Sequence, residues 1–311
     1  MKNLQDIQLL KEFDQLEFIA REVVEGFITG LHRSPFHGFS VEFAEHRLYN
    51  RGESTKHIDW KLFARTEKLF VKRYEEETNL RCHLVVDQSA SMFFPDRKHK
   101  PKLIRHKAAF SAMCAAALSE VMRRQRDASG LMLFDEEVRT FLPAKMSQTH
   151  QRILFHHLEP LLSETPPLSR KGNPAKVMHD LAERLPRRSL VVVFSDFMGP
   201  GPNHTEEVLD AIRHLRHQKH ETLLFHVVDE ALELDFNLPN RPFKFVDLET
   251  GLEVKAMPSA VKEQYVSAMK KMTETMSMGA AKYGATWIPA DINRGFEEVL
   301  WAYFIHRQKT L

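Results

Sequence analysis

Short apolar segments alternate with helical segments from residue 80 to the end of the chain, and this alternation constrains the fold more than any other feature. Residues 81–86, 190–194 and 222–228 have the composition and length of buried strands. Helical periodicity between them is typical of parallel strands joined by helical crossovers. The sequence therefore predicts an α/β fold with a doubly wound, Rossmann-like sheet that is mostly parallel and covered by helices on both faces.

Further elements complete this pattern. Residues 130–134 and 138–142 are close enough in sequence to pair antiparallel, and residues 243–255 predict a hairpin that turns at Glu249-Thr250-Gly251. Residues 285–288 predict a last strand. Amphipathic spacing and capping residues predict helices at residues 104–124, 147–162, 175–185, 205–217, 258–283 and 294–307.

The N-terminal part has a different organisation. Residues 9–31 show helical spacing, whereas residues 39–43 and 69–75 read as short strands. We therefore expect three parts, which are a helical segment (1–34), a small β-rich subdomain (35–79) and the α/β domain (80–311).

Composition bounds the class of protein. No apolar run approaches the roughly 18 residues that a membrane-spanning helix needs, and residues 1–15 carry charges instead of the apolar stretch of a signal peptide. We therefore predict a cytoplasmic protein without a membrane span. Cys82 and Cys114 lack a CxxC partner and are expected to be buried thiols. A net charge of +2 gives no indication of nucleic-acid binding.

Oxygen-bearing side chains follow two of the predicted strands where each strand ends. Asp87, Ser89 and Ser91 follow the first strand of the α/β domain, and Ser195-Asp196 follows a later one. Because the carboxyl ends of parallel strands meet at one edge of a sheet, we expect these side chains to converge. Carboxylates and hydroxyls suit a hard cation, so Asp87, Ser89, Ser91 and Asp196 predict a site for Mg²⁺ or Mn²⁺.

This pattern resembles the metal-ion-dependent adhesion site of von Willebrand factor A domains. That family carries Asp-x-Ser-x-Ser after its first strand, a Thr in a second loop and an Asp after a later strand. Asp87, Ser89, Ser91 and Asp196 match these elements apart from the Thr, and the resemblance spans residues 80–311 in element order. It implies that the two hydroxyls bind the metal directly and that one coordination position stays open for a partner's carboxylate.

The second loop departs from the family pattern. Residues 168–174 contain no Thr. Ser169 and Asn173 are weaker candidates to replace it, since hydroxyl and amide oxygens both bind hard cations. Alternatively, Arg170 or Lys171 places its positive charge against the two aspartates and takes the place of the metal.

The N-terminal part is similar to the opening of DUF family 58, and with it the resemblance covers nearly the whole chain. The matching segments are residues 27–35, 39–43, 47–53, 57–60 and 64–65. This resemblance implies association with a MoxR-type AAA+ ATPase. Many members carry transmembrane helices ahead of this region, whereas this chain resembles a short form without them.

These features predict a noncatalytic interaction protein, an adaptor that binds an acidic group of a MoxR-type AAA+ ATPase or of another protein through the metal site. Two alternatives stay open. A Mg²⁺- or Mn²⁺-dependent hydrolase, such as a phosphoesterase, would use the same oxygens, with Asp135 or His226 near a strand end as general base. A metal-free scaffold would use Arg170 or Lys171 instead. The sequence contains no nucleotide-binding glycine motif and no nucleophile elbow.

Three other polar groups have structural explanations. Residues 57–60 with Arg47, Arg51 and Arg65 favour a buried ion-pair network that ties the β-rich subdomain to the α/β domain, with Trp60 as packing. The basic segment 97–107 favours a solvated loop and helix face over a receptor for an acidic partner. The histidines at residues 214–220 favour a polar helix face, because no Cys or Glu at suitable spacing completes a zinc site.

Overall fold

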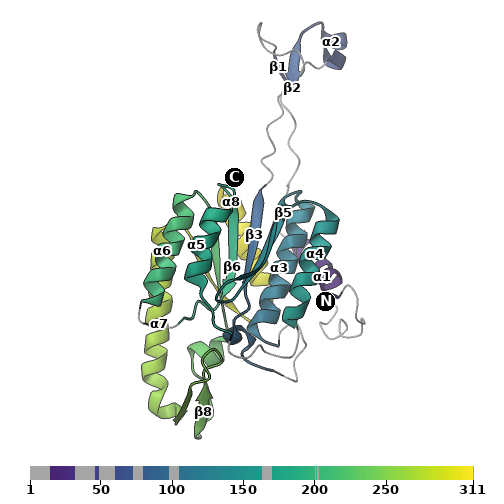
Figure 1. The fold of residues 1–311 in the computed structure, drawn as a ribbon. Helices are drawn as coiled ribbons and strands as arrows, with labels where there is room; N and C mark the ends of the chain where they lie inside the picture. Colours follow the sequence, from purple (N-terminus) through teal and green to yellow (C-terminus); the bar gives the residue numbers. More distant parts are fainter. Residues whose placement is uncertain are drawn as a thin grey trace. The chain divides into compact units, whose positions relative to one another are not determined.

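The computed structural model describes residues 15–31, 46–48, 60–72, 80–97, 105–162, 170–199, 201 and 203–310 (Figure 1). The chain forms two compact units. One consists of residues 1–28 and 80–311, and the other of Thr29–Asn79. The larger unit contains the central sheet.

This sheet has six strands in the order β10-β7-β6-β3-β4-β5. All neighbouring pairs are parallel except β4 and β5, which are antiparallel as the short spacing between them predicts. The predicted α/β fold with a mostly parallel central sheet is confirmed. The strands are β3 (Arg81–Asp87), β4 (Ala128–Phe134), β5 (Val138–Lys145), β6 (Leu190–Ser195), β7 (Glu221–Val228) and β10 (Thr286–Asp291).

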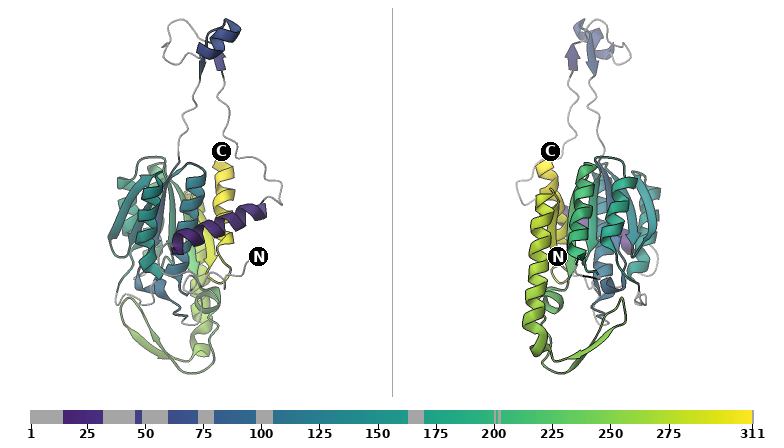
Figure 2. Two further views of the ribbon diagram at one scale, coloured as in Figure 1. Left: turned by 90° about the vertical axis from the view of Figure 1, so that its right-hand side faces the viewer. Right: turned by 60° about the vertical axis from the view of Figure 1, so that its left-hand side comes forward.

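Helices lie on both faces of the sheet (Figures 1 and 2). On one face, Val85 of β3 and Val193 of β6 pack against apolar side chains of three helices, α5, α6 and α7, whose bounds are given at the end of this paragraph. On the other face Phe110 stacks on Phe296 with ring centroids 5.3 Å apart. Both faces of β3 are buried from residue 82 onward, which fits its apolar run Leu84-Val85-Val86. The first face carries α5 (Pro174–Arg184), α6 (His204–His217) and α7 (Pro258–Lys282), and the second carries α3 (Lys107–Arg124), α4 (Gln148–Leu158), η5 (Glu159–Leu162) and α8 (Glu297–Thr310).

Two element boundaries differ from the predictions for local reasons. Helix α3 begins at Lys107 rather than residue 104, because His106 is extended and its Nδ1 accepts the Ala109 N–H at 3.1 Å. Strand β10 continues past residue 288 through Pro289. It lies at the edge of the sheet, where a missing N–H need not remove a ladder hydrogen bond.

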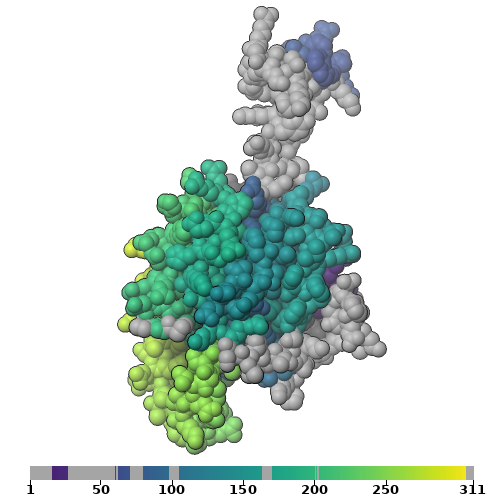
Figure 3. All heavy atoms as spheres, viewed as in Figure 1, coloured from purple at the N-terminus to yellow at the C-terminus, as the bar shows by residue number. Residues whose placement is uncertain are grey.

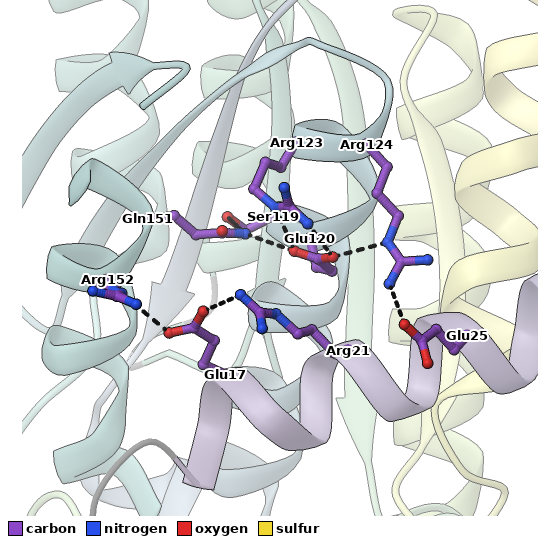
Figure 4. A network of polar contacts seen from close by, with 9 residues as sticks. All are labelled: Glu17, Arg21, Glu25, Ser119, Glu120, Arg123, Arg124, Gln151 and Arg152. Carbon is purple, nitrogen blue, oxygen red and sulfur yellow. Dashed lines mark hydrogen bonds and ion pairs between the residues drawn. The ribbon is translucent and has the colours of Figure 1, made fainter. Parts of the chain in front are cut away.

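Helix α1 (Gln15–Leu31) docks on α3 and α4 through a polar network (Figure 4). At its centre the fully buried Glu120 accepts hydrogen bonds from Arg123, Arg124 and Gln151. Burial alone would raise the pKa of Glu120, but these donors hold it at about 2. Arg124 also reaches Glu25 of α1 at 3.1 Å. The network thus ties the first helix to the larger unit.

The smaller unit contains an antiparallel pair of short strands and one helix. These are β1 (His46–Leu48), β2 (Phe70–Lys72) and α2 (Trp60–Thr66). Residues 39–43 and 57–59 lie outside the described residues. Trp60 packs edge-on against Phe63 and is 60% exposed. The prediction that Trp60 packs within a buried ion-pair network is therefore wrong.

A hairpin extends from the larger unit beyond the carboxyl edge of the sheet. It consists of β8 (Phe243–Val246) and β9 (Glu253–Ala256), which pair antiparallel as predicted. The π-helical turn η6 (Glu230–Leu234) precedes it, and α7 follows it. The remaining short element, η3 (Ala90–Phe93), follows β3.

Candidate functional site

The candidate site lies where the sheet topology reverses. The chain passes from β3 to β4 on one side and later returns to β6 on the other side of β3. Asp87 is the last residue of β3, and Asp196 directly follows β6. Because Val86 and Phe194 are register partners, the two aspartates leave the sheet at the same edge. Ligands of open α/β sheets bind outside the carboxyl ends of strands at such a switch point.

Asp87 is buried, and the chain satisfies both of its oxygens. Oδ1 accepts the Ser89 N–H at 2.8 Å, and Oδ2 accepts the Ser195 hydroxyl at 2.6 Å. Burial raises the pKa of Asp87 to about 7, and the nearby Asp196 charge adds to this rise. The carboxylate therefore favours a neighbouring positive charge.

Lys107 supplies a cation that the sequence analysis did not identify. Its Nζ lies 2.9 Å from Asp196 Oδ2 and 2.6 Å from Glu233 Oε1, and the side chain is 1% exposed. Burial lowers the pKa of Lys107, but Asp196 and Glu233 outweigh burial and hold it above its usual value. Burial would raise the pKa of Asp196, yet Lys107 lowers it. Lys107 and Asp196 thus form a buried ion pair.

The position of Lys107 corrects the prediction that the basic segment 97–107 is a solvated face. Residues 98–104 lie outside the part that the structure describes, but Arg105, His106 and Lys107 are all buried. The available signal is that Lys107 opens an almost wholly apolar helix. A lysine in such a helix is normally buried only when a carboxylate pairs with it.

Ser89 and Ser91 lie between the aspartates and the second loop. Their Oγ atoms are 3.1 Å apart, and the Ser91 hydroxyl interacts with Asp196 and lowers its pKa. The Ala90 N–H donates to the carbonyl of Arg170 at 2.8 Å, which fixes the first loop against the second. The structure therefore brings Asp87, Ser89, Ser91 and Asp196 together with Lys107, and we call these five residues the edge site.

The other second-loop candidates have different positions. Asn173 Oδ1 accepts the Lys176 N–H at 3.0 Å and caps α5. Ser169 lies outside the described residues. The Arg170 guanidinium is 3.4 Å from Asp135, and Lys171 is exposed. Among the described residues, Lys107 is the basic side chain that pairs with Asp196, in place of either loop cation.

A carboxylate from the β8–β9 hairpin enters the edge site, which sequence reasoning also missed. Glu249 Oε2 accepts the Gly172 N–H at 3.1 Å. Glu249 Oε1 is buried and has no hydrogen-bond partner in the described part of the chain. The Ser91 hydroxyl lies close enough to this carboxylate to lower its pKa. A side chain at Gly172 would meet Ser89 Oγ at 3.2 Å, so glycine leaves room for the approach.

Negative charge exceeds positive charge in this region. Of the four carboxylates here, Asp87, Asp196, Glu233 and Glu249, two contact the ammonium group of Lys107, which are Asp196 and Glu233. Burial raises the pKa of both Glu233 and Glu249, and Asp196 adds to each rise. The region therefore favours an additional cation or bound protons.

Two features fit a hydrated Mg²⁺ or Mn²⁺. Two oxygens at right angles and about 2.1 Å from Mg²⁺ are about 3.0 Å apart, close to the observed separation of the Ser89 and Ser91 hydroxyls. The unpartnered Glu249 Oε1 is a further oxygen donor. No three acidic, histidine or cysteine side chains among the described residues are placed to hold a metal by themselves. Serine hydroxyls would thus be direct ligands.

The two residues considered as general bases for a hydrolase have other roles or surroundings in the structure. Asp135 accepts bonds from the Arg139 guanidinium at 2.8 and 2.9 Å. His226 is 1% exposed beside Trp287, and burial lowers its pKa to about 4. This geometry gives the hydrolase alternative no added support.

Comparison with known proteins identifies related sequences. Residues 45–275 match the family described as "Protein of unknown function DUF58". Uncharacterized proteins of Mycobacterium bovis and Mycobacterium tuberculosis are each 26% identical to the chain over 240 residues, which is 76% of this chain and 70% of each relative.

Two solved structures also align with most of the chain. The conserved hypothetical protein BatB from Bacteroides thetaiotaomicron has a TM-score of 0.44 and 11% identity, with 71% of this chain and 97% of that chain covered. An uncharacterized membrane spanning protein from Vibrio fischeri has a TM-score of 0.22 and 15% identity, with 73% and 98% covered.

The description of the Vibrio fischeri structure contradicts the prediction of a cytoplasmic location, and that prediction is withdrawn. No helix among the described residues is long and apolar enough to cross a membrane. Association with a membrane does not require such a helix within those residues.

Proposed function

This chain belongs to the DUF58 family of proteins of unknown function, and from its edge site we propose that it is a noncatalytic interaction protein that binds a carboxylate of a partner protein. The observation that carries this proposal is the position of Glu249. Its carboxylate accepts the Gly172 N–H beside the hydroxyls of Ser89 and Ser91. A backbone N–H and hydroxyl groups are suitable donors for an acidic side chain.

We propose further that the α/β domain is of von Willebrand factor A type and that Mg²⁺ or Mn²⁺ binds at Ser89 and Ser91, with Asp87 and Asp196 behind them. The spacing of the hydroxyls supports this proposal. When bound, the metal would attract a partner's carboxylate through its positive charge. The expected result is that Mg²⁺ or Mn²⁺ raises the melting temperature and that Asp87→Ala abolishes the rise. Identical melting curves in EDTA and in Mg²⁺ would reject the metal.

The buried Lys107 favours a second form of this function, in which the site works without a metal. Lys107 already provides positive charge next to Asp196 at 2.9 Å. In this form the partner's carboxylate binds the serine hydroxyls and the Gly172 N–H, while Lys107 lowers the negative potential behind them. Partner binding would then be the same in EDTA and in Mg²⁺.

We propose a MoxR-type AAA+ ATPase as the partner, and the family resemblance supports this choice. The test is calorimetric titration of the purified ATPase into the full chain, in EDTA and in Mg²⁺. Ser91→Ala should weaken binding roughly tenfold, as expected for loss of a hydrogen bond to a charged group. Ser259→Ala, which changes an exposed serine of α7, is the matched control. Equal affinity of wild type and Ser91→Ala would reject the proposed site.

A further inference from the structure

The tip of the β8–β9 hairpin is built to present Glu249. Asp247 Oδ1 accepts the Glu249 N–H at 2.9 Å, and the Asp247 carbonyl accepts the Gly251 N–H at 2.8 Å. Thr250 Oγ1 donates to the other Asp247 oxygen. Gly251 has a φ of +73°, a conformation that favours glycine. These contacts fix the turn while leaving the Glu249 side chain free to reach the edge site.

The rest of the hairpin is held mainly at its base. There Phe236 stacks on Phe245 with ring centroids 5.6 Å apart, and Tyr265 of α7 packs on Phe236 at 4.6 Å. Nearer the tip, Leu248 and Leu252 are exposed. In Figures 1 and 3 the hairpin and the start of α7 project from the body of the larger unit.

The tip thus contacts the edge site through one charged side chain. Glu249 Oε2 accepts the Gly172 N–H, and Oε1 is buried without a hydrogen-bond partner among the residues that the structure describes. Few other buried contacts secure the tip, since its apolar side chains face solvent. Segments held by few buried contacts open more readily than the core. Movement about the aromatic base would withdraw Glu249 and leave the donors of Gly172 and Ser91 open.

We infer that Glu249 is an internal ligand of the edge site, which holds the position of a partner's carboxylate until the hairpin tip moves away. This inference rests on the proposed function. A tethered carboxylate competes at an effective concentration in the millimolar range. A partner therefore binds a site that is open only part of the time, and its apparent affinity is its intrinsic affinity multiplied by the open fraction. The geometry also favours a glutamate presented by a turn as the partner's ligand.

The first test asks whether the site accepts a carboxylate in place of Glu249. Glu249→Ala removes the side chain from a half-exposed turn, and acetate should then raise the melting temperature relative to chloride at equal ionic strength. Wild type should show no such rise. The control Glu253→Ala removes a hairpin carboxylate that pairs with Lys244 at the surface, and it should behave as wild type. No acetate-specific rise in Glu249→Ala would overturn the inference.

The second test asks whether Glu249 competes with an added ligand. The probe is a fluorescent peptide of residues 243–256, measured by fluorescence anisotropy. It should bind Glu249→Ala roughly tenfold more tightly than wild type, because the internal competitor is lost. The same peptide carrying Glu249→Gln should bind neither protein. Equal binding to wild type and Glu249→Ala would overturn the inference, even if acetate is accepted.

These tests separate the inference from the proposed function. Neither acetate nor the peptide involves the ATPase. If both tests succeed while the ATPase fails to bind wild type and Glu249→Ala, the choice of partner fails and Glu249 stands as an internal ligand. If the ATPase binds through Ser91 while acetate has no effect on Glu249→Ala, the proposed function stands and the inference fails.

Discussion

Replacing Lys107 by methionine tests whether the ammonium group is the cation on which the edge site depends. Lys107 is 1% exposed, and its Nζ contacts Asp196 at 2.9 Å and Glu233 at 2.6 Å. Methionine keeps most of the apolar stem, so little packing is lost. The substitution removes the positive charge and leaves two buried carboxylates without it.

The expected loss follows from these contacts. Removing one partner of a buried ion pair costs about 3–5 kcal/mol of unfolding free energy. Asp196 keeps the Met198 N–H at 3.0 Å, and Glu233 keeps the Asp229 N–H at 2.8 Å. These bonds limit the cost, so we expect about 4 kcal/mol. At about 2–4 °C per kcal/mol, the melting temperature should fall by about 8–16 °C.

Urea denaturation followed by circular dichroism measures the change in unfolding free energy. The matched control is Lys176→Met, because Lys176 is an exposed lysine 3.6 Å from Glu137. Its loss should be below about 1 kcal/mol, as for other surface pairs. A loss below about 1 kcal/mol for Lys107→Met as well would refute the buried ion pair. The variant also separates the two forms of the site, since Mg²⁺ should restore stability only if a metal binds there.

Three other perturbations test the surrounding fold. His83 is buried with no hydrogen-bond partner among the described residues, and burial lowers its pKa from 6.5 to about 4. As the pH falls, His83 therefore takes up a proton in the unfolded chain before it does so in the folded protein. The free energy of unfolding consequently falls as the pH drops from 6.5 towards 4. His83→Leu should remove up to about 3 kcal/mol of that fall in urea titrations, and an unchanged pH profile would contradict the assignment. The pKa of Glu120 is lowered from 4.5 to about 2, so its contribution is complete above pH 4.5 and is lost towards pH 2. Because its arginine partners are partly exposed, Glu120→Gln should cost about 1–2 kcal/mol at neutral pH, and wild-type stability would argue against the network. Gly172→Ala would place a Cβ 3.1 Å from Ser89 Cβ. The second loop should shift away from Ser89, which weakens the Gly172 N–H bond to Glu249 and speeds hydrogen exchange at the hairpin tip, whereas unaltered exchange would count against that contact.

Local sequence patterns were sufficient for the elements of the larger unit. The apolar runs at β3 and β6 end where polar residues begin, which places Asp87 and Asp196 at strand ends. The short connection between β4 and β5 forces an antiparallel pair, and the turn residues around Gly251 predict the hairpin. Each of these features depends on residues close together in sequence.

The charged side chains that meet at the edge site come from segments far apart in the sequence, so local patterns do not predict their contacts. Lys107 comes from the start of α3, and Glu249 comes from a hairpin much later in the chain. The local pattern identifies neither partner, since the apolar helix after Lys107 indicates only that this lysine is buried and Glu249 lies in an ordinary polar turn. Their contacts arise only when the crossover helices and the hairpin pack over the same edge.

The sequence by itself determined the α/β class, the strand ends and the oxygen-rich loops, because hydrophobic periodicity and turn chemistry act over a few residues. Only the tertiary structure decided which charges meet there. Lys107, rather than Arg170 or Lys171, pairs with Asp196, and Glu249 reaches the Gly172 N–H and the Ser91 hydroxyl. The physical reason is burial. A charge removed from water must find a partner within a few ångströms, and packing rather than sequence distance decides which partner is in reach.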